Sequence, residues 1–195
     1  MKILVVVDMQ NDFITGSLGN PQAQAIVENV RNKIKAHAKN GDMIIYTLDT
    51  HDKDYLGTPE GKMLPVEHCI EGTKGWMLHP DIESASGYKR YLPNREIFIQ
   101  KDTFGVSDWN DVLEDVYDKL THDFGEDIDG VYIDEIELIG LCTDICVVTN
   151  ALLLKTFDPE IKITVDASCC AGVTEESHKA ALLTMRMCQV NVINE

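Results

Sequence analysis

Six apolar runs recur along the chain, and amphipathic segments separate most of them. The run over residues 2–8 (KILVVVD) is nearly continuous, which is typical of a strand buried on both faces. Further strands are predicted over residues 42–49, 96–101, 131–140, 161–167 and 190–193. Helical spacing predicts helices over residues 21–39, 112–120, 144–155 and 175–187. This alternation predicts an α/β protein: a three-layer α/β/α sandwich with a six-stranded, mostly parallel sheet.

Two segments interrupt the alternation. Residues 50–95 carry four of the six prolines and show little periodicity. A loop of that length in a compact domain is usually functional, so we expect it to contribute to a metal or substrate site. Residues 121–137 are predicted to form an acidic hairpin or insertion before the fourth strand. The length of 195 residues suits a single domain over residues 1–195.

Composition narrows the possible partners and the compartment. The formal net charge of −16 argues against nucleic acid or an anionic membrane surface as a partner. No apolar run approaches the roughly 20 residues that a membrane span needs, and the first ten residues contain no leader cleavage site. We therefore expect a cytoplasmic protein whose six cysteines are thiols or ligands rather than disulfides.

Chemically versatile residues end the predicted strands. Asp8 ends the first strand, Asp49 and His51 end the second, Lys101 ends the third, and Cys146 follows the fourth. In open parallel sheets, ligands bind beyond the carboxyl ends of the strands. We therefore expect these side chains to meet at one rim of the sheet.

Cys142 and Cys146 lie four positions apart where the fourth strand gives way to a helix. They can be coincidental core residues, a metal clip, or a pair that includes a nucleophile. As a nucleophile, Cys146 would need its thiol pKa, about 8.5 when free, lowered by the helix N-terminus and by the Lys101 ammonium. Asp8 could accept the thiol proton and pass it to a leaving amine. Burial, helix capping and solvation are the ordinary alternatives for Cys146, Asp8 and Lys101 respectively.

Three stretches resemble the signature segments of the isochorismatase-like cysteine hydrolases. They are VVDMQNDF (6–13), KDTFGVSDW (101–109) and GLCTDICVVTNAL (140–152), in the family's order, and the chain is most similar to the nicotinamidases. The resemblance implies a catalytic triad of Asp8, Lys101 and Cys146. It also implies a cis Leu141–Cys142 peptide bond, with the backbone amides of Cys142 and Cys146 as the oxyanion hole.

A metal site is the second expectation. Asp49 and His51 lie two positions apart, so their side chains share a face of the strand, and this donor pair suits a divalent transition metal. The resemblance adds His68 as a third ligand and a fourth that is His or Glu, for which Glu60 is the candidate. One divalent ion is therefore expected, zinc first, with iron or manganese as alternatives. Such an ion would orient a substrate ring nitrogen rather than activate water.

Aromatic residues near the rim are candidates for holding a ring. Phe13 matches a pocket position of the family, Phe104 would form a second wall, and Trp109 is an alternative whose other interpretation is core packing. Histidines in or beside helical segments are expected to be exposed or capping residues; these are His37, His122 and His178.

The expected function is hydrolysis of nicotinamide to nicotinate and ammonia through a thioester on Cys146. The alternatives are hydrolysis of another small amide, such as a carbamoyl or ureido compound, and a non-catalytic metal-binding α/β protein. A nucleotide-binding protein is disfavoured because no G-x-G-x-x-G follows the first strand. The partner is thus a small molecule, and the resemblance allows a homo-oligomer.

Overall fold

Strands and helices alternate along the chain, as the apolar pattern predicts. The computed structural model describes residues 1–86, 95–124 and 132–195. Its strands are β1 (Lys2–Val7), β2 (Met43–Asp49), β3 (Glu96–Lys101), β4 (Glu135–Leu141), β5 (Lys162–Ala171) and β6 (Asn191–Ile193). The longer helices are α2 (Pro21–Asn40), α5 (Trp109–Phe124), α6 (Val148–Phe157) and α7 (Glu175–Met187). Shorter helical segments are α1 (Asn11–Ile14), η1 (Tyr55–Gly57), α3 (Pro59–Met63), α4 (Pro80–Ser86) and the π-helical turn η3 (Thr143–Val147).

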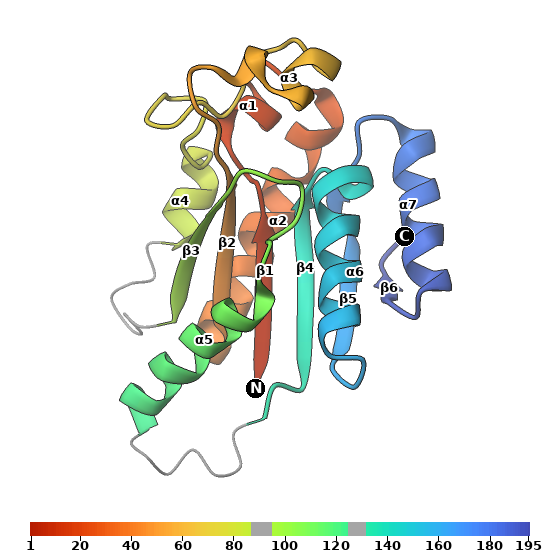
Figure 1. Cartoon of the computed structure of the whole chain (residues 1–195). Coiled ribbons are helices and arrows are strands. Elements are labelled where there is room, and N and C mark those ends of the chain that lie inside the picture. Colours follow the sequence, from red (N-terminus) through yellow and green to blue (C-terminus); the bar gives the residue numbers. More distant parts are fainter. Residues whose placement is uncertain (87–94, 125–131) are drawn as a thin grey trace.

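The six strands form one sheet in the order β3-β2-β1-β4-β5-β6, and every neighbouring pair is parallel. The predicted α/β fold with a six-stranded sheet is therefore confirmed. The strand order reverses direction between β1 and β4, and ligands of open parallel sheets bind at such a reversal, beyond the carboxyl ends of the strands. Those ends point toward α1 and α3 in Figure 1.

Alternating side chains of β1 serve two separate cores. Ile3, Val5 and Val7 belong to an apolar cluster with residues of α5, α6 and α7, whereas Leu4 and Val6 belong to a second cluster with residues of α2 and α4. All five side chains are fully buried. Figure 1 shows the resulting layers, with α5 and α6 on one face of the sheet and α2 on the other. Burial on both faces explains why β1 reads as a continuous apolar run.

Helix α2 begins and ends at residues that the sequence marks. Asn20 caps it, because its side-chain oxygen accepts a hydrogen bond from Ala23 N at 2.8 Å, and Pro21 occupies the first helical position. Gly41 ends it with φ of +78°, a left-handed conformation that glycine adopts without steric cost. Across the three ranges of the chain that the structure describes, no helix is both long and apolar enough to cross a membrane.

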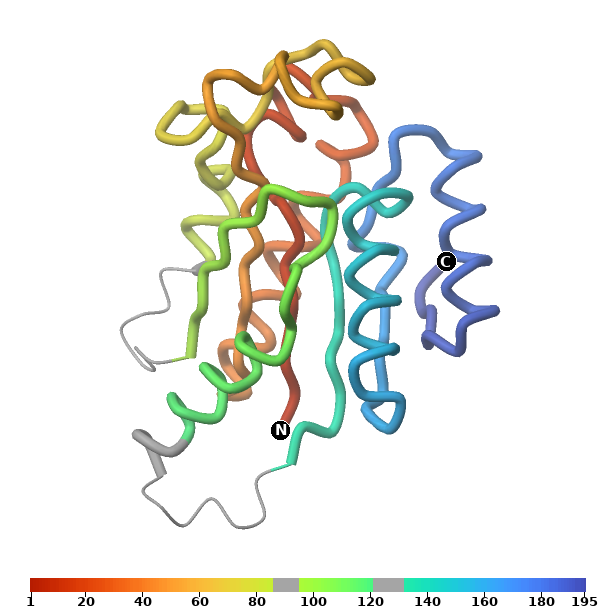
Figure 2. The backbone as a smooth tube through the Cα atoms, in the orientation of Figure 1, coloured from red at the N-terminus to blue at the C-terminus, as the bar shows by residue number. Residues whose placement is uncertain are grey.

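Some element bounds differ from the prediction. Helix α5 continues to Phe124 and β4 begins at Glu135, so both ends of the predicted acidic insertion (121–137) belong to regular elements; residues 125–131 lie outside the described residues. The long segment after β2 contains η1, α3 and α4. The part with η1 and α3 folds over the carboxyl end of the sheet beside residues that follow β1 (Figure 2), whereas α4 packs against α2 on a face of the sheet. These helices are too short to produce a clear periodic signal.

The expectation that His37 is exposed or caps a helix is wrong. Its side chain is buried, with Nδ1 3.0 Å from Asp42 Oδ2 and Nε2 3.1 Å from Glu137 Oε2. Both carboxylates lie outside α2, so the helical pattern of α2 alone contains no sign of them. The side chain of His122 lies outside the described residues.

Candidate active site and metal centre

Asp8, Lys101 and Cys146 come together beyond the strand ends. Lys101 reaches from the end of β3, and its Nζ lies 2.8 Å from Asp8 Oδ2 and 3.7 Å from Cys146 Sγ. The same ammonium lies 3.4 Å from Asp49 Oδ1. Thr47 Oγ1 donates a hydrogen bond of 2.7 Å to Asp8 Oδ1, which fixes the orientation of that carboxylate. All three predicted triad residues are at least nine-tenths buried.

A tight turn after β4 positions Cys146. Gly140 makes the close approach possible, because its φ is +116° and a Cβ there would lie 2.2 Å from Val7 O. The Leu141–Cys142 peptide bond is cis, as the resemblance implied. Ile145 N and Val147 N both donate to the Cys142 carbonyl, at 3.1 and 3.0 Å, so Cys142 and Cys146 stand at the two ends of the turn. Both are free thiols. Cys142 directly precedes the π-helical turn and Cys146 lies within it, and such turns recur at functional sites.

The electrostatics of the triad differ from the sequence expectation. Burial and the neighbouring Asp8 carboxylate raise the pKa of the Cys146 thiol well above its ordinary value, and the Lys101 ammonium offsets this only in part. Burial also raises the pKa of Asp8, against the opposing effect of Lys101. Although burial alone would lower it, the pKa of Lys101 is raised by Asp8, Cys146 and Asp49. The thiol pKa is therefore raised and not lowered as predicted, chiefly because Cys146 is buried and also because two carboxylates share the Lys101 ammonium.

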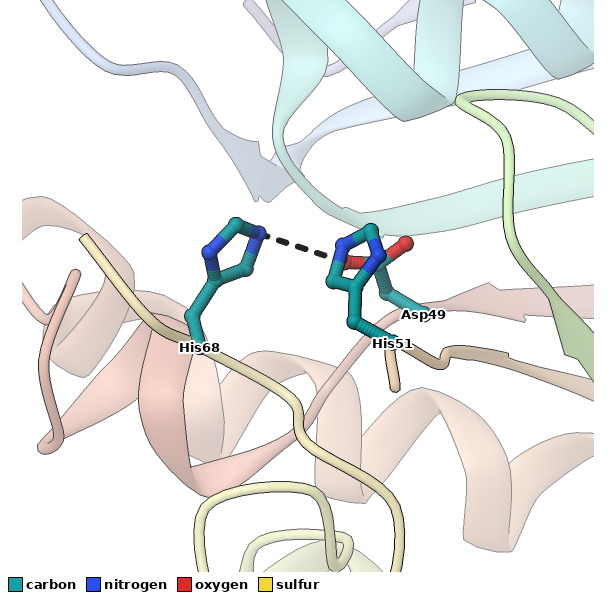
Figure 3. A group of neighbouring side chains, drawn as sticks. All are labelled: Asp49, His51 and His68. Atoms are coloured by element: carbon teal, nitrogen blue, oxygen red, sulfur yellow. Dashed lines mark ion pairs between the residues drawn. The ribbon is translucent and has the colours of Figure 1, made fainter. Parts of the chain in front are cut away.

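A candidate metal site lies beside the triad. Asp49, His51 and His68 each offer one ligand atom, and these atoms lie within 4.8 Å of one another (Figure 3). Asp49 Oδ2 is 3.0 Å from His51 Nε2 and 3.4 Å from His68 Nε2. Burial would raise the pKa of Asp49, but the two imidazoles and the Lys101 ammonium hold it well below its usual value. The carboxylate is therefore ionised and ready to bind a cation.

The geometry of the two histidines fits a metal ion. His68 Nδ1 is 2.9 Å from the Val66 carbonyl, a donor arrangement that leaves the lone pair of Nε2 facing Asp49. Nε2 of His51 is buried and makes no hydrogen bond with the described residues, so it lacks a partner that a metal would supply. Glu60 Oε1 lies 3.8 Å from this nitrogen and its side chain is 28% exposed. Glu60 is thus next to the three-residue cluster without being one of its members.

A cavity of about 310 Å³ opens onto Cys146 of the predicted triad and onto Asp49 and His68 of the candidate metal site. Phe13 and Phe104 both line it, and the Phe13 ring meets the edge of the His68 ring at 5.6 Å. Trp109 is not among the lining residues and is instead buried in the core at the start of α5. Apolar residues that the sequence analysis did not single out complete the wall: Leu18, Leu64, Ile145 and Val173. The cavity can hold a small ring with its reacting carbon near Cys146.

The isochorismatase domain family matches residues 2–195. The chain belongs to the isochorismatase family. The nicotinamidase/pyrazinamidase of Mycobacterium tuberculosis is 25% identical over 197 residues, which cover 99% of this chain and 98% of the relative. A crystal structure of the nicotinamidase/pyrazinamidase of Bacillus subtilis has a TM-score of 0.81 and 25% identity, and covers 100% of both chains. N-carbamoylsarcosine amidase from Thermoplasma acidophilum has a TM-score of 0.70 and 25% identity, over 98% of this chain and 95% of that one.

Residues just after Asp8 hold the long loop of this family member against the sheet. Gln10 Nε2 donates to the carbonyls of Asp49 and Trp76, at 2.8 and 2.7 Å, and Gln10 Oε1 accepts a hydrogen bond from Asp49 N at 2.8 Å. Asp12 Oδ2 accepts a hydrogen bond of 2.9 Å from Cys69 N, directly after His68. The sequence stretch MQND therefore positions the candidate metal ligands, a role that its composition does not reveal.

The Asn150 side chain also bonds to backbone groups beside the site. Its Oδ1 accepts a hydrogen bond from Val106 N at 2.8 Å, and its Nδ2 donates to the Cys146 carbonyl at 2.9 Å. The side chain is fully buried, and these two hydrogen bonds connect η3 to the loop that follows Lys101. The sequence analysis missed this residue because a polar position within an apolar helix gives no indication of a partner 44 residues away.

Residues of helix α7 also contact the turn η3. His178 is only partly exposed, and its Nδ1 lies 2.8 Å from Thr143 Oγ1, outside its own helix, so the expectation of an exposed or capping residue is wrong. Asp144 accepts hydrogen bonds from Val173 N at 3.1 Å and from the hydroxyl of Ser177. These contacts link η3 to the start of α7 and hold one wall of the cavity in place.

Proposed function

We propose that this chain is a nicotinamidase, which hydrolyses nicotinamide to nicotinate and ammonia. The observation that carries the proposal is that Cys146 lines a cavity that also reaches a candidate metal site, while Lys101 contacts both Cys146 and Asp8. The aromatic wall and the cavity volume of about 310 Å³ suit a single planar ring. The relatives named above, two of which are nicotinamidases by name, support the same substrate class.

In the first half-reaction, Cys146 Sγ attacks the amide carbon while Asp8 takes the thiol proton. Asp8 then delivers this proton to the amide nitrogen, the C–N bond breaks, and ammonia leaves a thioester on Cys146. Lys101 stays protonated throughout, because the groups around it raise its pKa. Its ammonium stabilises the negative charge as this charge passes from Asp8 to the sulfur.

The second half-reaction returns the enzyme to its starting state. Water attacks the thioester carbon, Asp8 takes a proton from the water, and the acid is released as the Cys146 thiol re-forms. The amides of Cys142 and Cys146, at the two ends of the turn, would bind the oxyanion in both halves. The hydrogen bonds from Ile145 N and Val147 N to the Cys142 carbonyl pre-organise that turn.

Asp49, His51 and His68 would hold one divalent ion, with Glu60 as a fourth ligand. The donor set suits zinc first, and iron or manganese as alternatives. When bound, the ion supplies a coordination position that a pyridine nitrogen can occupy, which orients the ring. Phe13, in contact with His68, would then lie along the bound ring.

The alternative substrate class is a carbamoyl or ureido compound, which N-carbamoylsarcosine amidase represents among the structural neighbours. Substrates of that kind that carry a carboxylate need a cationic partner. Lysine and arginine are absent from the residues that line the cavity in the described part of the chain. Apart from the proposed metal ion, the lining thus offers no cation to a substrate carboxylate, which favours a neutral amide.

Cys146→Ala tests the mechanism, and Cys188→Ala is its matched control because Cys188 is exposed and far along the chain. We expect Cys146→Ala to reduce ammonia release from nicotinamide by at least about 1000-fold with its metal content unchanged, and Cys188→Ala to keep wild-type turnover. Ammonia release by Cys146→Ala at the wild-type rate would contradict the mechanism. A higher kcat/KM for an N-carbamoyl amino acid than for nicotinamide would favour the alternative substrate class.

A further inference from the structure

The metal cluster lies between two separate hollows of the surface. Asp49 and His68 line the substrate cavity, whereas His51 lines a second, open depression of about 520 Å³. Glu60, the candidate for a fourth ligand, lines both hollows. The substrate cavity thus reaches the ligands from one side, and the depression reaches His51 from the other.

The depression is strongly acidic. Besides Glu60, its lining includes Asp52, Asp54, Glu71 and Asp102, and no lysine or arginine from the described ranges joins them. Within the same ranges these four carboxylates form no ion pair. Their charges are therefore not neutralised, and a cleft lined by one sign of charge raises the local concentration of counter-ions.

A nitrogen that can bind a metal ion lies buried behind the inner wall of the depression. His51 is 8% exposed, and its buried Nε2 has no hydrogen-bond partner in the described chain. Backbone hydrogen bonds hold this wall rigidly, because His51 N donates to the Cys69 carbonyl at 3.0 Å and Glu71 N donates to the His51 carbonyl at 2.9 Å. Glu60 Oε1, 3.8 Å from His51 Nε2, stands between the depression and the cluster.

We propose that divalent metal ions enter the Asp49–His51–His68 site through this acidic depression, past Glu60, and not through the substrate cavity. The inference rests on the metal centre of the proposed function. It gives the free carboxylates a role in loading, and it allows the metal to exchange while the substrate cavity is occupied. An ion entering through the cavity would instead have to pass the apolar residues that line it.

The test is the rate at which Co²⁺ binds to the metal-free full-length protein, followed by visible absorption in a stopped-flow instrument. The variant Asp52→Asn/Asp54→Asn/Glu71→Gln removes three charges without changing a ligand. Its matched control, Asp111→Asn/Glu114→Gln/Asp115→Asn, removes the same three charges from the exposed face of α5.

At low ionic strength we expect the depression variant to bind Co²⁺ about 10-fold more slowly, and the control to stay within about 2-fold of wild type. In 1 M salt, where the Debye length is about 3 Å, the two rates should converge. Final stoichiometry and the rate of Co²⁺ loss to a chelator should not change, because peripheral charges act mainly on association. Equal rates for the two variants at low salt would overturn the proposal.

A second arm obstructs the substrate cavity with the variant Val173→Trp, because Val173 lines this cavity and not the depression. We expect the Co²⁺ association rate to stay within about 2-fold, and a loss as large as that of the depression variant would assign entry to the cavity instead. These readouts do not depend on turnover. Normal Co²⁺ binding without nicotinamide hydrolysis would refute the proposed substrate and leave the entry route supported, whereas no Co²⁺ binding at all would refute the metal centre together with the route.

Discussion

Replacing Lys101 with methionine removes the one cation that the triad shares. The Lys101 ammonium lies 2.8 Å from Asp8 Oδ2 and 3.4 Å from Asp49 Oδ1, and its side chain is 2% exposed. At an effective dielectric constant of about 20, these two attractions amount to roughly 6 and 5 kcal/mol. Desolvation of the ammonium offsets much of this, so we expect unfolding free energy at pH 7 to fall by about 3–5 kcal/mol, the usual cost of leaving a buried charge unpaired.

The same substitution should slow the chemical step. The ammonium is 3.7 Å from Cys146 Sγ, and its attraction for a developing thiolate is on the order of 4 kcal/mol at the same effective dielectric constant. Because each 1.36 kcal/mol of lost transition-state stabilisation is a factor of ten, kcat for nicotinamide should fall by about 1000-fold.

Lys33→Met is the matched control. Lys33 also lies between two carboxylates, with Nζ 2.8 Å from Glu137 Oε1 and 2.6 Å from Asp166 Oδ2, but on α2, away from the strand ends that carry the triad. Its side chain is 23% exposed, so solvent screening should reduce the stability loss to about 1–2 kcal/mol. Its kcat should equal that of wild type while the protein is folded.

Urea unfolding followed by tryptophan fluorescence measures the stability terms, and single-turnover ammonia release under folding conditions measures the chemical step. If Lys101→Met retains kcat within tenfold of wild type, Lys101 does not stabilise the thiolate and the assigned role is refuted. If Lys101→Met is as stable as wild type, the burial argument is refuted instead. A parallel loss of kcat in Lys33→Met would show that the assay reports folding rather than chemistry.

Three further predictions follow from other contacts. Burial alone would raise the pKa of Asp166, but the hydrogen bond from Lys33 lowers it. The pair therefore stabilises the fold fully above about pH 4, and less as the pH falls through the lowered pKa. The difference in urea stability between wild type and Lys33→Met should accordingly narrow from pH 6 to about pH 3. Asp8→Asn should reduce kcat by about 100- to 10,000-fold and remove the acidic limb of the pH profile of kcat/KM. In the wild type we expect this limb at a pH above the ordinary carboxyl pKa, because burial raises the pKa of Asp8. Asn150→Ala should cost about 1–3 kcal/mol in urea unfolding, because it leaves the buried Val106 amide without its acceptor, and an unchanged midpoint would contradict this.

Strong local signals made most of the fold predictable. The pattern places β3 at residues 96–101 and α7 at residues 175–187, and the structure has both with these bounds. Where tertiary contacts decide, the prediction fails: α1 has four residues, too few for periodicity, and forms where Asn11 and Asp12 bond to the long loop. The same limit applies to β5, which runs beyond its predicted end because Cys169 and Cys170 are buried there.

The site was predictable to the extent that parallel topology determines it. Strand ends of one sheet must meet at one rim, so Asp8, Lys101 and Cys146 could be grouped from strand positions alone. Residues that act through the backbone of a distant segment, such as Gln10 and Asn150, could not be found in that way, because their partners are set only when the chain folds.

The charge balance of the triad explains why the Cys146 thiol can have a raised pKa and still act. Asp8 and Asp49 bring two negative charges against the single positive charge of Lys101, so ionising the thiol alone would add a further uncompensated charge to a buried site. Transfer of the proton from Cys146 to Asp8 leaves the total charge unchanged, because one anion is replaced by another beside the same ammonium. In the proposed mechanism, attack and proton transfer are therefore coupled: the thiol stays protonated, and resistant to stray electrophiles, until a substrate carbonyl accepts the sulfur. Activation by a shared proton, rather than by a preformed thiolate, would be the physical reason that the proposed triad needs its acid as much as its cation.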